Sequence, residues 1–289
     1  MSWLDKLPPK IRSLGGLIKR GGEDAIKCPK TGFLVFIKDL EKNFWVDPDS
    51  GYHFQVGAHK RLDITFDNGT WEELSVPEVN ANPLGFRDRK RHSVRVREAR
   101  KLTGMRSAIA LGFGAVENVP MVIAAHDFRF VGGSVGTAEG ETVMTGFKDA
   151  VERRVPLIIF TSSGGARLQE GIYSLMQLPR TTVARDRMRE AKLPFIVVLT
   201  NPTMGGTTAS YGMLGDIHIA EPEAQIGFAG RRVIEQVTKE IPPAGFQDAE
   251  KLLEHGMLDI IVDRRQMRSM LARLCRLLGA STTIPHPNT

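Results

Sequence analysis

Short apolar runs alternate with amphipathic stretches over most of the chain. From about residue 108, the runs AIALGFGAV, PMVIAAHDF, PLIIFTSS, PFIVVLTN, DIHIAEP and AQIGFAG are typical of buried strands. Helical spacing is found in ETVMTGFKDAVERR, GIYSLMQLPRTTVARDRMREA and TTASYGML, which lie between them. This alternation predicts an α/β domain whose sheet is covered by helices. The segment QDAEKLLEHGMLDIIVDRRQMRSMLARLCRLLG is expected to form two helices around a short strand.

The first 60 residues have a different pattern. We expect residues 1–25 to form a flexible or loosely docked leader. In residues 26–60, FLVFI, KDLEKN and FWV alternate apolar and polar positions around a predicted hairpin. Residues 61–100 are expected to be helical and irregular, with a Pro/Asn-rich stretch. The predicted organisation is therefore a leader (1–25), a small β hairpin (26–60) and a large α/β domain (61–289).

Composition and cysteine content indicate the cellular compartment of the protein. The 289 residues are 42% hydrophobic and 25% charged, which is ordinary for a globular protein with its own core. Cys28 and Cys275 are too few and too distant for a disulfide framework. The N-terminus lacks a signal-peptide core, and no apolar run reaches the ~18 residues of a membrane span. These features predict a cytoplasmic protein with no membrane partner.

The net charge of +6 is moderate, and its densest part is the run RDRKRHSVRVREARK, residues 87–101. Such a run is either a solvated face or a phosphate-binding patch. It does not by itself predict nucleic-acid binding.

Two glycine-rich turns follow apolar strands, and these carry the candidate chemistry. One is FTSSGGARLQEG, which contains Gly164 and Gly165; the other is LTNPTMGGTTASYGMLGD, which contains Gly205 and Gly206. Glycine permits close approach to the backbone, and a helix start presents unpaired N–H groups. Two such turns at adjacent strand ends can converge on one carbonyl oxygen as an oxyanion hole. The alternative is a pair of ordinary strand–helix turns.

A third turn, FRFVGGSVGTAEGE, has the same form and contains Gly132, Gly133 and Gly136. It is neither a Walker loop nor a GxGxxG motif, although it could bind phosphate.

No side chain stands out as a catalytic base or nucleophile. Ser162 and Ser163 are outside any G-x-S-x-G elbow. His126 and His218 lie in strand-like segments, where packing is the simpler interpretation. Glu139, Glu170 and Asp216 are possible acids or helix caps. The base for an enolate-forming reaction is therefore expected from the other substrate or from a partner chain.

These motifs resemble a known family, the carboxyltransferase β subunits of bacterial acetyl-CoA carboxylase. The similarity is carried by TSSGGARLQEGIYSLMQL, LTNPTMGGTTASYGMLGDIHIAEP, IGFAGRRVIEQ, VGGSVG and EHGMLDIIVDRR, and spans residues 26–275. It implies a crotonase-like fold of stacked ββα units, with an N-terminal zinc ribbon in many members. It also implies an α2β2 assembly whose active site lies between the α and β subunits.

The resemblance implies transfer of a carboxyl group from carboxybiotin to acetyl-CoA, giving malonyl-CoA for fatty-acid synthesis. Carboxybiotin releases carbon dioxide, and the biotin anion deprotonates the acetyl methyl group. The implied partners are the α subunit, the biotin carboxyl carrier protein and biotin carboxylase, which consumes ATP. No nucleic-acid partner is expected.

The resemblance also implies roles for individual residues. Gly205 and Gly206 would form the oxyanion turn of this subunit. Gly164, Gly165 and Ala166 would form the facing loop. Arg167 and the turn of Gly132 and Gly133 would shape the coenzyme A or biotin pocket. The α subunit would supply a second oxyanion hole, so this chain alone is expected to be inactive.

The zinc ribbon is degenerate here. Family members with zinc have C-x2-C, fifteen residues and C-x2-C, whereas this chain has Cys28, Thr31, Asp47 and Ser50 at those positions. A structural zinc site needs four good ligands, mostly thiolate or imidazole, and His53 lies outside the knuckle spacing. We therefore expect a metal-free ribbon packed by an apolar cluster of Phe33, Val35, Phe44, Trp45 and Phe54.

Two alternatives remain at this point. One is a subunit of a related acyl-CoA carboxyltransferase or malonate decarboxylase, because oxyanion turns do not specify the acyl group. The other is a nucleic-acid-binding ribbon protein, which the basic run and the pI of 9.4 favour.

Overall fold

The computed structural model describes residues 17–20 and 23–281. It divides into two compact units, one ending at Gln55 and the other beginning at Val56. Within the described residues, no helix has the length and apolar character needed to cross a membrane.

The larger unit is built around a twisted, mostly parallel sheet with strand order β11-β9-β8-β7-β6-β5-β4, and β10 pairs with β8. Strands β6, β7, β8, β9 and β11 are parallel along this order, whereas β4 and β5 are antiparallel to their neighbours. The strands are β4 (Glu72–Glu73), β5 (Ile109–Val116), β6 (Val119–His126), β7 (Leu157–Ser163), β8 (Phe195–Met204), β9 (Ile217–Ala220), β10 (Ile226–Gly227) and β11 (Ile260–Ile261).

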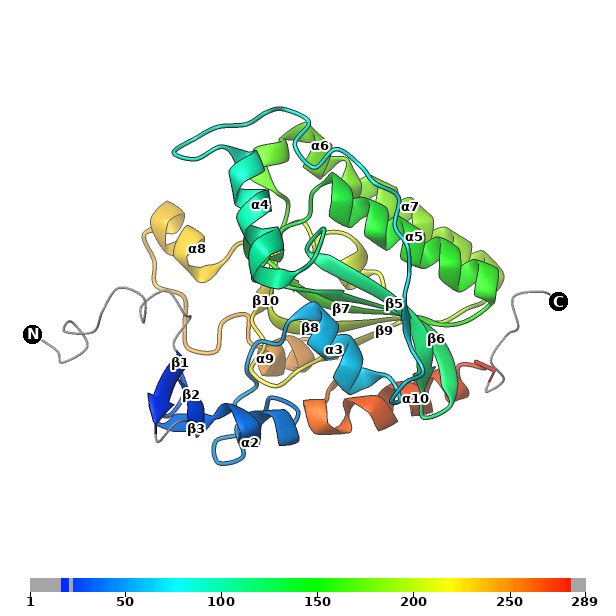
Figure 1. Ribbon diagram of the computed structural model, residues 1–289, viewed down its shortest axis with the longest axis horizontal. Coiled ribbons are helices and arrows are strands. Elements are labelled where there is room, and N and C mark those ends of the chain that lie inside the picture. The colour runs from blue at the N-terminus through cyan, green and yellow to red at the C-terminus, as the bar shows by residue number, and fades with distance from the viewer. Residues whose placement is uncertain (1–16, 21–22, 282–289) are drawn as a thin grey trace, which may run out of the picture. The chain divides into compact units, whose positions relative to one another are not determined.

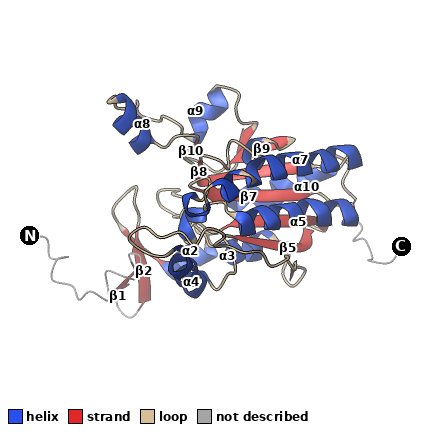
Figure 2. Cartoon of the chain, turned by 90° about the horizontal axis from the view of Figure 1, so that it is seen from above, coloured by secondary structure: helices blue, strands red, loops and turns tan. Residues whose placement is uncertain are grey.

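Helices cover both faces of this sheet. Helices α5 and α7 run along one face, and α3 and α10 lie on the other (Figure 1; Figure 2). The α-helices of this unit are α3 (Ala58–Thr65), α4 (His92–Thr103), α5 (Thr137–Arg153), α6 (Ile172–Leu175), α7 (Gln177–Ala191), α8 (Arg231–Thr238), α9 (Ala249–Glu254) and α10 (Met267–Leu277). Short 3₁₀ helices are η2 (Val131–Gly133), η3 (Leu168–Glu170), η4 (Tyr211–Met213) and η5 (Arg264–Gln266).

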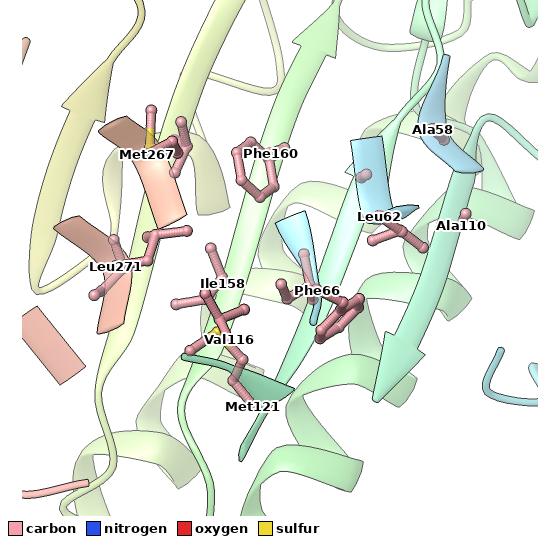
Figure 3. Packing of buried hydrophobic residues seen from close by; sticks show 14 of the residues in the cluster. Ala58, Leu62, Phe66, Ala110, Val116, Met121, Ile158, Phe160, Met267 and Leu271 are labelled. Atoms are coloured by element: carbon pink, nitrogen blue, oxygen red, sulfur yellow. The ribbon is translucent and has the colours of Figure 1, made fainter. Parts of the chain in front are cut away.

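Each face of the sheet has its own apolar core, because successive side chains of a strand point to opposite faces. On β7, Ile158 and Phe160 pack toward α3 and α10, while Leu157 and Ile159 pack toward α5 and α7. Figure 3 shows the first of these cores, where Leu62 of α3, Phe66 just after α3 and Leu271 of α10 surround the strand side chains. Strands buried on both faces explain the continuous apolar runs in the sequence.

The strands and helices expected in this unit are confirmed with one exception. The stretch TTASYGML forms a succession of turns and the short helix η4, not an α-helix. Glycine at 205, 206 and 212 and a β-branched pair at 207–208 disfavour a regular helix there. The exception matters for function, because this irregular backbone follows directly from β8.

The smaller unit contains a three-stranded antiparallel sheet of β1 (Leu17–Arg20), β2 (Glu23–Lys27) and β3 (Leu34–Phe36), followed by α2 (Ile37–Lys42). The expected hairpin between FLVFI and FWV is wrong. Strand β3 pairs with β2, and KDLEK is helical. The helix forms because Lys, Leu and Glu are strong helix formers. Phe44 and Trp45 have φ of 57° and 60°, which is incompatible with a strand.

The predicted leader, residues 1–25, falls largely outside the described residues. Its described parts, residues 17–20 and 23–25, lie in β1 and β2.

A small apolar cluster holds the smaller unit together, but its membership differs from the prediction. Val35 and Phe54 are buried in it as expected, and Trp45 packs against it. Leu40 and Cys28 complete its centre. Phe33 is 76% exposed and does not contribute to the cluster, and Phe44 is not among its members.

Three of the four knuckle positions form a hydrogen-bonded chain. The Ser50 hydroxyl donates to Asp47 Oδ2 at 2.6 Å, and its oxygen lies 3.5 Å from Cys28 Sγ. Burial alone would raise the pKa of Asp47, but hydrogen bonds from Ser50, Cys28 and the backbone lower it. Thr31, the fourth position, is exposed, and its hydroxyl accepts from the Phe33 N–H.

These residues do not fit a structural zinc ion. They offer one thiol, one carboxylate and two hydroxyls, whereas such sites use thiolate and imidazole ligands. Among the described residues, no cluster of three His, Cys, Asp or Glu side chains has the geometry for a metal. The Cys28–Ser50–Asp47 chain instead joins the two former knuckles directly.

The purified chain is therefore expected to contain far less than one equivalent of zinc after dialysis, because its knuckle side chains hydrogen-bond to one another. Metal analysis by mass spectrometry measures this directly. A chelator should also leave the thermal unfolding midpoint unchanged. One equivalent of zinc that survives dialysis would show that the ribbon keeps a metal site.

Candidate functional site

Three glycine-rich turns meet at the carboxyl edge of the parallel strands. The first turn (residues 131–136) follows β6, the second (residues 163–167) follows β7, and the third (residues 205–210) follows β8. Because β6, β7 and β8 are parallel neighbours, their carboxyl ends lie at one edge of the sheet. This is the edge at which α/β folds place their ligands.

The first and second turns are joined through their backbones. The Gly164 N–H donates to the Gly132 carbonyl at 2.9 Å, and the Val135 N–H donates to the Gly165 carbonyl at 2.8 Å. A Cβ atom on Gly133 would lie 2.0 Å from the Ser162 carbonyl oxygen. Only glycine allows this contact, so Gly133 is required by close approach.

The second and third turns touch at their glycines. A Cβ atom on Gly165 would lie 3.0 Å from the Gly206 nitrogen and 3.1 Å from the Gly205 Cα. Gly165 also has φ of +106°, which L side chains rarely adopt. The structure therefore brings together Gly164, Gly165 and Ala166 of one turn with Gly205 and Gly206 of the other.

Two amides at this contact are unpaired. Among the described residues, neither the Ala166 N–H nor the Gly206 N–H has a hydrogen-bond partner. They lie close together, because a Cβ on Gly206 would be 3.3 Å from the Ala166 nitrogen. Gly206 is buried, and a buried N–H without a partner is costly and rare. Such a pair is suited to receive an anionic or strongly polarised oxygen.

Arg167 holds the second turn in place through buried ion pairs and hydrogen bonds. Its Nη1 lies 3.0 Å from Glu170 Oε1, and its Nη2 lies 2.8 Å from Glu139 Oε1. Its Nε donates to the Ser134 hydroxyl at 3.1 Å. The guanidinium and both carboxylates are completely buried. Arg167 thus fixes the loop and offers no exposed donor to a ligand.

Electrostatics keep this buried network charged. Burial alone would raise the pKa of Glu139, but the Arg167 guanidinium and backbone donors lower it below its usual value. Burial alone would lower the pKa of Arg167, but Glu139 and Glu170 raise it. Removing one of these three side chains would leave a buried charge without its counter-charge, which is strongly destabilising.

Glu139 and Glu170 are also the caps of α5. Glu139 accepts from the Gly136 N–H at 2.9 Å, and Glu170 accepts from the Thr137 N–H at 2.7 Å. Of the two roles considered for these residues, the structure therefore supports capping, and it adds the ion pairs with Arg167.

A buried histidine connects the first and third turns. His126 Nδ1 lies 3.3 Å from the Gly133 carbonyl oxygen, and Nε2 lies 2.9 Å from the Tyr211 hydroxyl. Burial lowers the pKa of His126 to about 4 and raises the pKa of Tyr211. His126 is therefore neutral near pH 7. Because a carbonyl only accepts, Nδ1 carries the proton and Nε2 accepts from the tyrosine.

The remaining candidates lie outside the glycine turns. Asp216 pairs with Arg185 and accepts from the Phe195 N–H at 2.9 Å. His218 Nε2 accepts from the Gly215 N–H, and burial lowers its pKa. In the basic run, Lys90 and Arg95 form ion pairs with Glu98 and Asp88 near the surface. These contacts stabilise the fold locally.

Three side chains next to the turns form hydrogen bonds that the sequence does not predict. They are Ser163, Thr207 and Tyr211. From the sequence, Ser163 is considered only as a nucleophile, and Thr207 and Tyr211 lie in the stretch TTASYGML, which is expected to be helical. Ser163 and Thr207 each adjoin a glycine pair, which is the local signal for these two.

A cavity of about 700 Å³ among the described residues does not include the two amides. It is lined by residues 73–81 together with Arg100 and Arg106, among others, and not by the second and third turns. Around these turns, Leu168 and Phe228 are 84% and 70% exposed. Large apolar side chains next to the turns are therefore exposed on this chain.

The buried, neutral His126 predicts a pH dependence of stability. Its pKa is about 4 in the folded chain and about 6.5 when unfolded, so between these values the unfolded chain binds one more proton. The free energy of unfolding should fall as pH drops through this window, by up to about 1.4 kcal/mol per unit. Replacing His126→Gln should remove that contribution from the slope, measured by urea unfolding at pH 4.5, 5.5 and 7. Identical slopes in both proteins would show that His126 titrates normally.

Comparison with known proteins agrees with this architecture. Residues 57–245 match the family model described as "Carboxyl transferase domain". The chain is 56% identical over 286 residues to the acetyl-coenzyme A carboxylase carboxyl transferase subunit beta of Rhodopseudomonas palustris strain TIE-1, covering 98% of this chain and 87% of that protein. It is 54% identical over 288 residues to the subunit of the same name from Bradyrhizobium sp. strain ORS 278, covering 99% and 92%.

A solved structure shares the fold at much lower identity. The Pseudomonas malonate decarboxylase hetero-dimer superposes with a TM-score of 0.60 and 20% identity, covering 77% of this chain and 86% of that one. The crotonase-like fold expected from the sequence is thereby confirmed. The chain belongs to the carboxyl transferase family, among the β subunits of acetyl-coenzyme A carboxylase carboxyl transferase.

Proposed function

We propose that this chain is the β half of a carboxyltransferase that forms malonyl-CoA. The carboxyl group comes from carboxybiotin on a biotin carboxyl carrier protein, and the acceptor is acetyl-CoA. Both are substrates, and no covalently bound cofactor is assigned to this chain. The proposal is supported by the family of the chain and by the two unpaired amides at the carboxyl edge of the sheet.

The observation that carries the mechanism is that the Ala166 and Gly206 amides lie close together and are unpaired among the described residues. Carboxyl transfer places negative charge on a carbonyl oxygen when the acetyl group becomes an enolate or the biotin ureido group becomes an anion. Fixed N–H donors stabilise that charge without reorganising. The biotin anion takes the methyl proton, and the resulting enolate attacks carbon dioxide to form the new C–C bond. No side-chain base is then needed at this edge.

Glycine at these positions has a second consequence. With no side chain on Gly165, Gly205 or Gly206, a substrate oxygen can reach the backbone directly. Gly132 and Gly133 hold the second turn against β6 and so shape one wall of the site. Arg167 acts through the same turn, because its guanidinium is buried against Glu139 and Glu170.

Exposed apolar side chains near the site support a partner that covers it. Apolar side chains stand exposed beside the amides, including Leu168, Ile172 and Met176 after the second turn and Phe228 beside the third. The Phe228 carbonyl accepts from the Gly205 N–H at 3.0 Å, so the backbone of this exposed residue lies next to the third turn. We propose that the carboxyltransferase α subunit covers this region in an α2β2 assembly. Biotin carboxylase, which uses ATP, would recharge the carrier, and the complex would work in the cytoplasm.

The alternative of a malonate decarboxylase or other acyl-CoA carboxyltransferase subunit is not favoured. The relatives at 54–56% identity are named as acetyl-coenzyme A carboxylase subunits, whereas the malonate decarboxylase structure shares only 20% identity. A nucleic-acid-binding role has no specific structural feature in its support.

A reconstitution tests this function. The chain is purified alone and together with the α subunit from the same organism, and each preparation is assayed for malonyl-CoA-dependent carboxylation of biocytin, the reverse reaction. Activity is expected only in the mixture, because the site lacks its second half here. The α subunit alone serves as the control.

Each other result of that assay has a distinct meaning. Activity of this chain alone would contradict a shared site. A stable complex without activity toward malonyl-CoA, but with activity toward another acyl thioester, would change the assigned substrate.

Replacing Gly206→Ala tests the amide pair. The backbone at Gly206 needs no left-handed φ, so alanine can adopt its conformation, but the added Cβ would lie 3.3 Å from both the Ala166 nitrogen and Leu178 Cδ2, which is a crowded contact. Access of a substrate oxygen to both amides should be obstructed. We expect kcat of the reconstituted enzyme to fall about 100-fold or more, as when an oxyanion donor is lost.

Gly230→Ala is the matched control. Gly230 has φ of −66°, and a Cβ there would meet nothing within 4 Å. Unchanged turnover in Gly206→Ala, with a folded and assembled protein, would remove the two amides from the mechanism.

A further inference from the structure

We infer that two buried pairs of polar side chains, Thr207–Ser163 and Tyr211–His126, set the relative position of the Ala166 and Gly206 amides. These four are positioning residues that act through the backbone turns. The inference rests on the proposed function, because it assumes that the two amides bind a reacting oxygen. It goes further by identifying what holds them in place.

Ser163 and Thr207 form the central link. The Thr207 hydroxyl donates to Ser163 Oγ at 2.8 Å, and the Gly165 N–H donates to the same oxygen at 3.0 Å. One serine oxygen therefore ties the Gly164–Gly165 peptide group to Thr207, the residue just after Gly206. Both side chains are 0% exposed, so water cannot substitute for either contact without entering the interior.

Two contacts fix the peptide groups on either side of Gly165. The Gly165 N–H donates inward to Ser163, and the Gly165 carbonyl accepts from the Val135 N–H. Because the C=O and N–H of a trans peptide point in opposite directions, the Ala166 N–H points away from Val135. The Ser163 hydroxyl fixes the preceding peptide group and so limits rotation of the peptide that carries the Ala166 amide.

Tyr211 and His126 form a second, separate link. Tyr211 lies in η4 just after the third turn, and its hydroxyl donates to His126 Nε2 at 2.9 Å. His126 Nδ1 donates to the Gly133 carbonyl at 3.3 Å. The two links together connect all three turns that meet at the site. Tyr211 is 1% exposed and His126 is 3% exposed.

Apolar packing alone could not fix the positions of the two amides. The turns meet mainly at glycines, so there are few side chains at the contact that could interdigitate as they do between helices. Directional hydrogen bonds fix distance and orientation where side-chain packing is missing. Misplacing catalytic donors by about 1 Å lowers turnover about 100-fold.

Thr207→Val tests the inference, because valine keeps the shape of threonine and removes only the hydroxyl. Thr207→Ser keeps the hydroxyl and serves as the rescue variant. Thr181→Val is the matched control, since Thr181 is also 0% exposed but its hydroxyl donates only to carbonyls of its own helix, Gln177 and Leu178. All are assayed as complexes with the α subunit.

We expect kcat of Thr207→Val to fall about 10- to 100-fold, with KM for malonyl-CoA changed less than about threefold. Thr207→Ser should stay within about threefold of the wild type, and Thr181→Val should match it. A Thr207→Val enzyme whose kcat equals that of Thr181→Val would overturn the inference. If Thr207→Val fails to fold, Tyr211→Phe takes its place, and unchanged turnover there has the same meaning.

Amide hydrogen exchange of the isolated full-length chain provides a readout independent of activity. Thr207→Val should accelerate exchange both in residues 163–168 and in residues 204–211, whereas Thr181→Val should accelerate neither. Faster exchange confined to residues 204–211 would show that Thr207 does not hold the second turn. If the wild-type complex is inactive while both segments loosen, the proposed function fails and the structural link stands.

Discussion

The site depends on one constraint, which is the close approach of three glycine-rich turns. Gly133 lies against the Ser162 carbonyl, and Gly165 lies against Gly205 and Gly206, at distances where a Cβ atom would clash or crowd. This approach is possible only because β6, β7 and β8 are parallel neighbours whose carboxyl ends share one edge. Helices on both faces fix the strands, so the turns inherit their positions from two apolar cores.

Backbone groups brought together in this way need support from elsewhere. Arg167 with Glu139 and Glu170 holds the second turn to the start of α5, and two polar pairs connect the turns. These buried contacts, which include the separate Thr207–Ser163 and Tyr211–His126 pairs, have strong hydrogen bonds and make any unpaired member costly. The chemistry proposed for the site uses neutral backbone donors, while the charged side chains stay behind them. This division explains why the sequence shows no obvious catalytic base.

Much of the fold could be predicted from the sequence, because strands buried on both faces of a parallel sheet have continuous apolar sequences. The glycine pairs at 164–165 and 205–206 also stood out, since each follows such a run. The two polar pairs could not be found in this way. Thr207 and Tyr211 come from a stretch that appeared helical, and their partners Ser163 and His126 are 44 and 85 residues away. In the smaller unit, the prediction of a hairpin failed at Phe44 and Trp45. Both residues have a left-handed φ, which a sequence normally signals by a glycine, and here both are aromatic.

The central claim is that the Ala166 and Gly206 amides jointly bind a reacting carbonyl oxygen. A structure of this chain assembled with the α subunit, biotin and an unreactive acetyl-CoA analogue tests it most directly. The account predicts that the thioester or ureido oxygen of one ligand lies about 3 Å from both nitrogens. Ligands bound in the shared site with neither oxygen near these amides would contradict it.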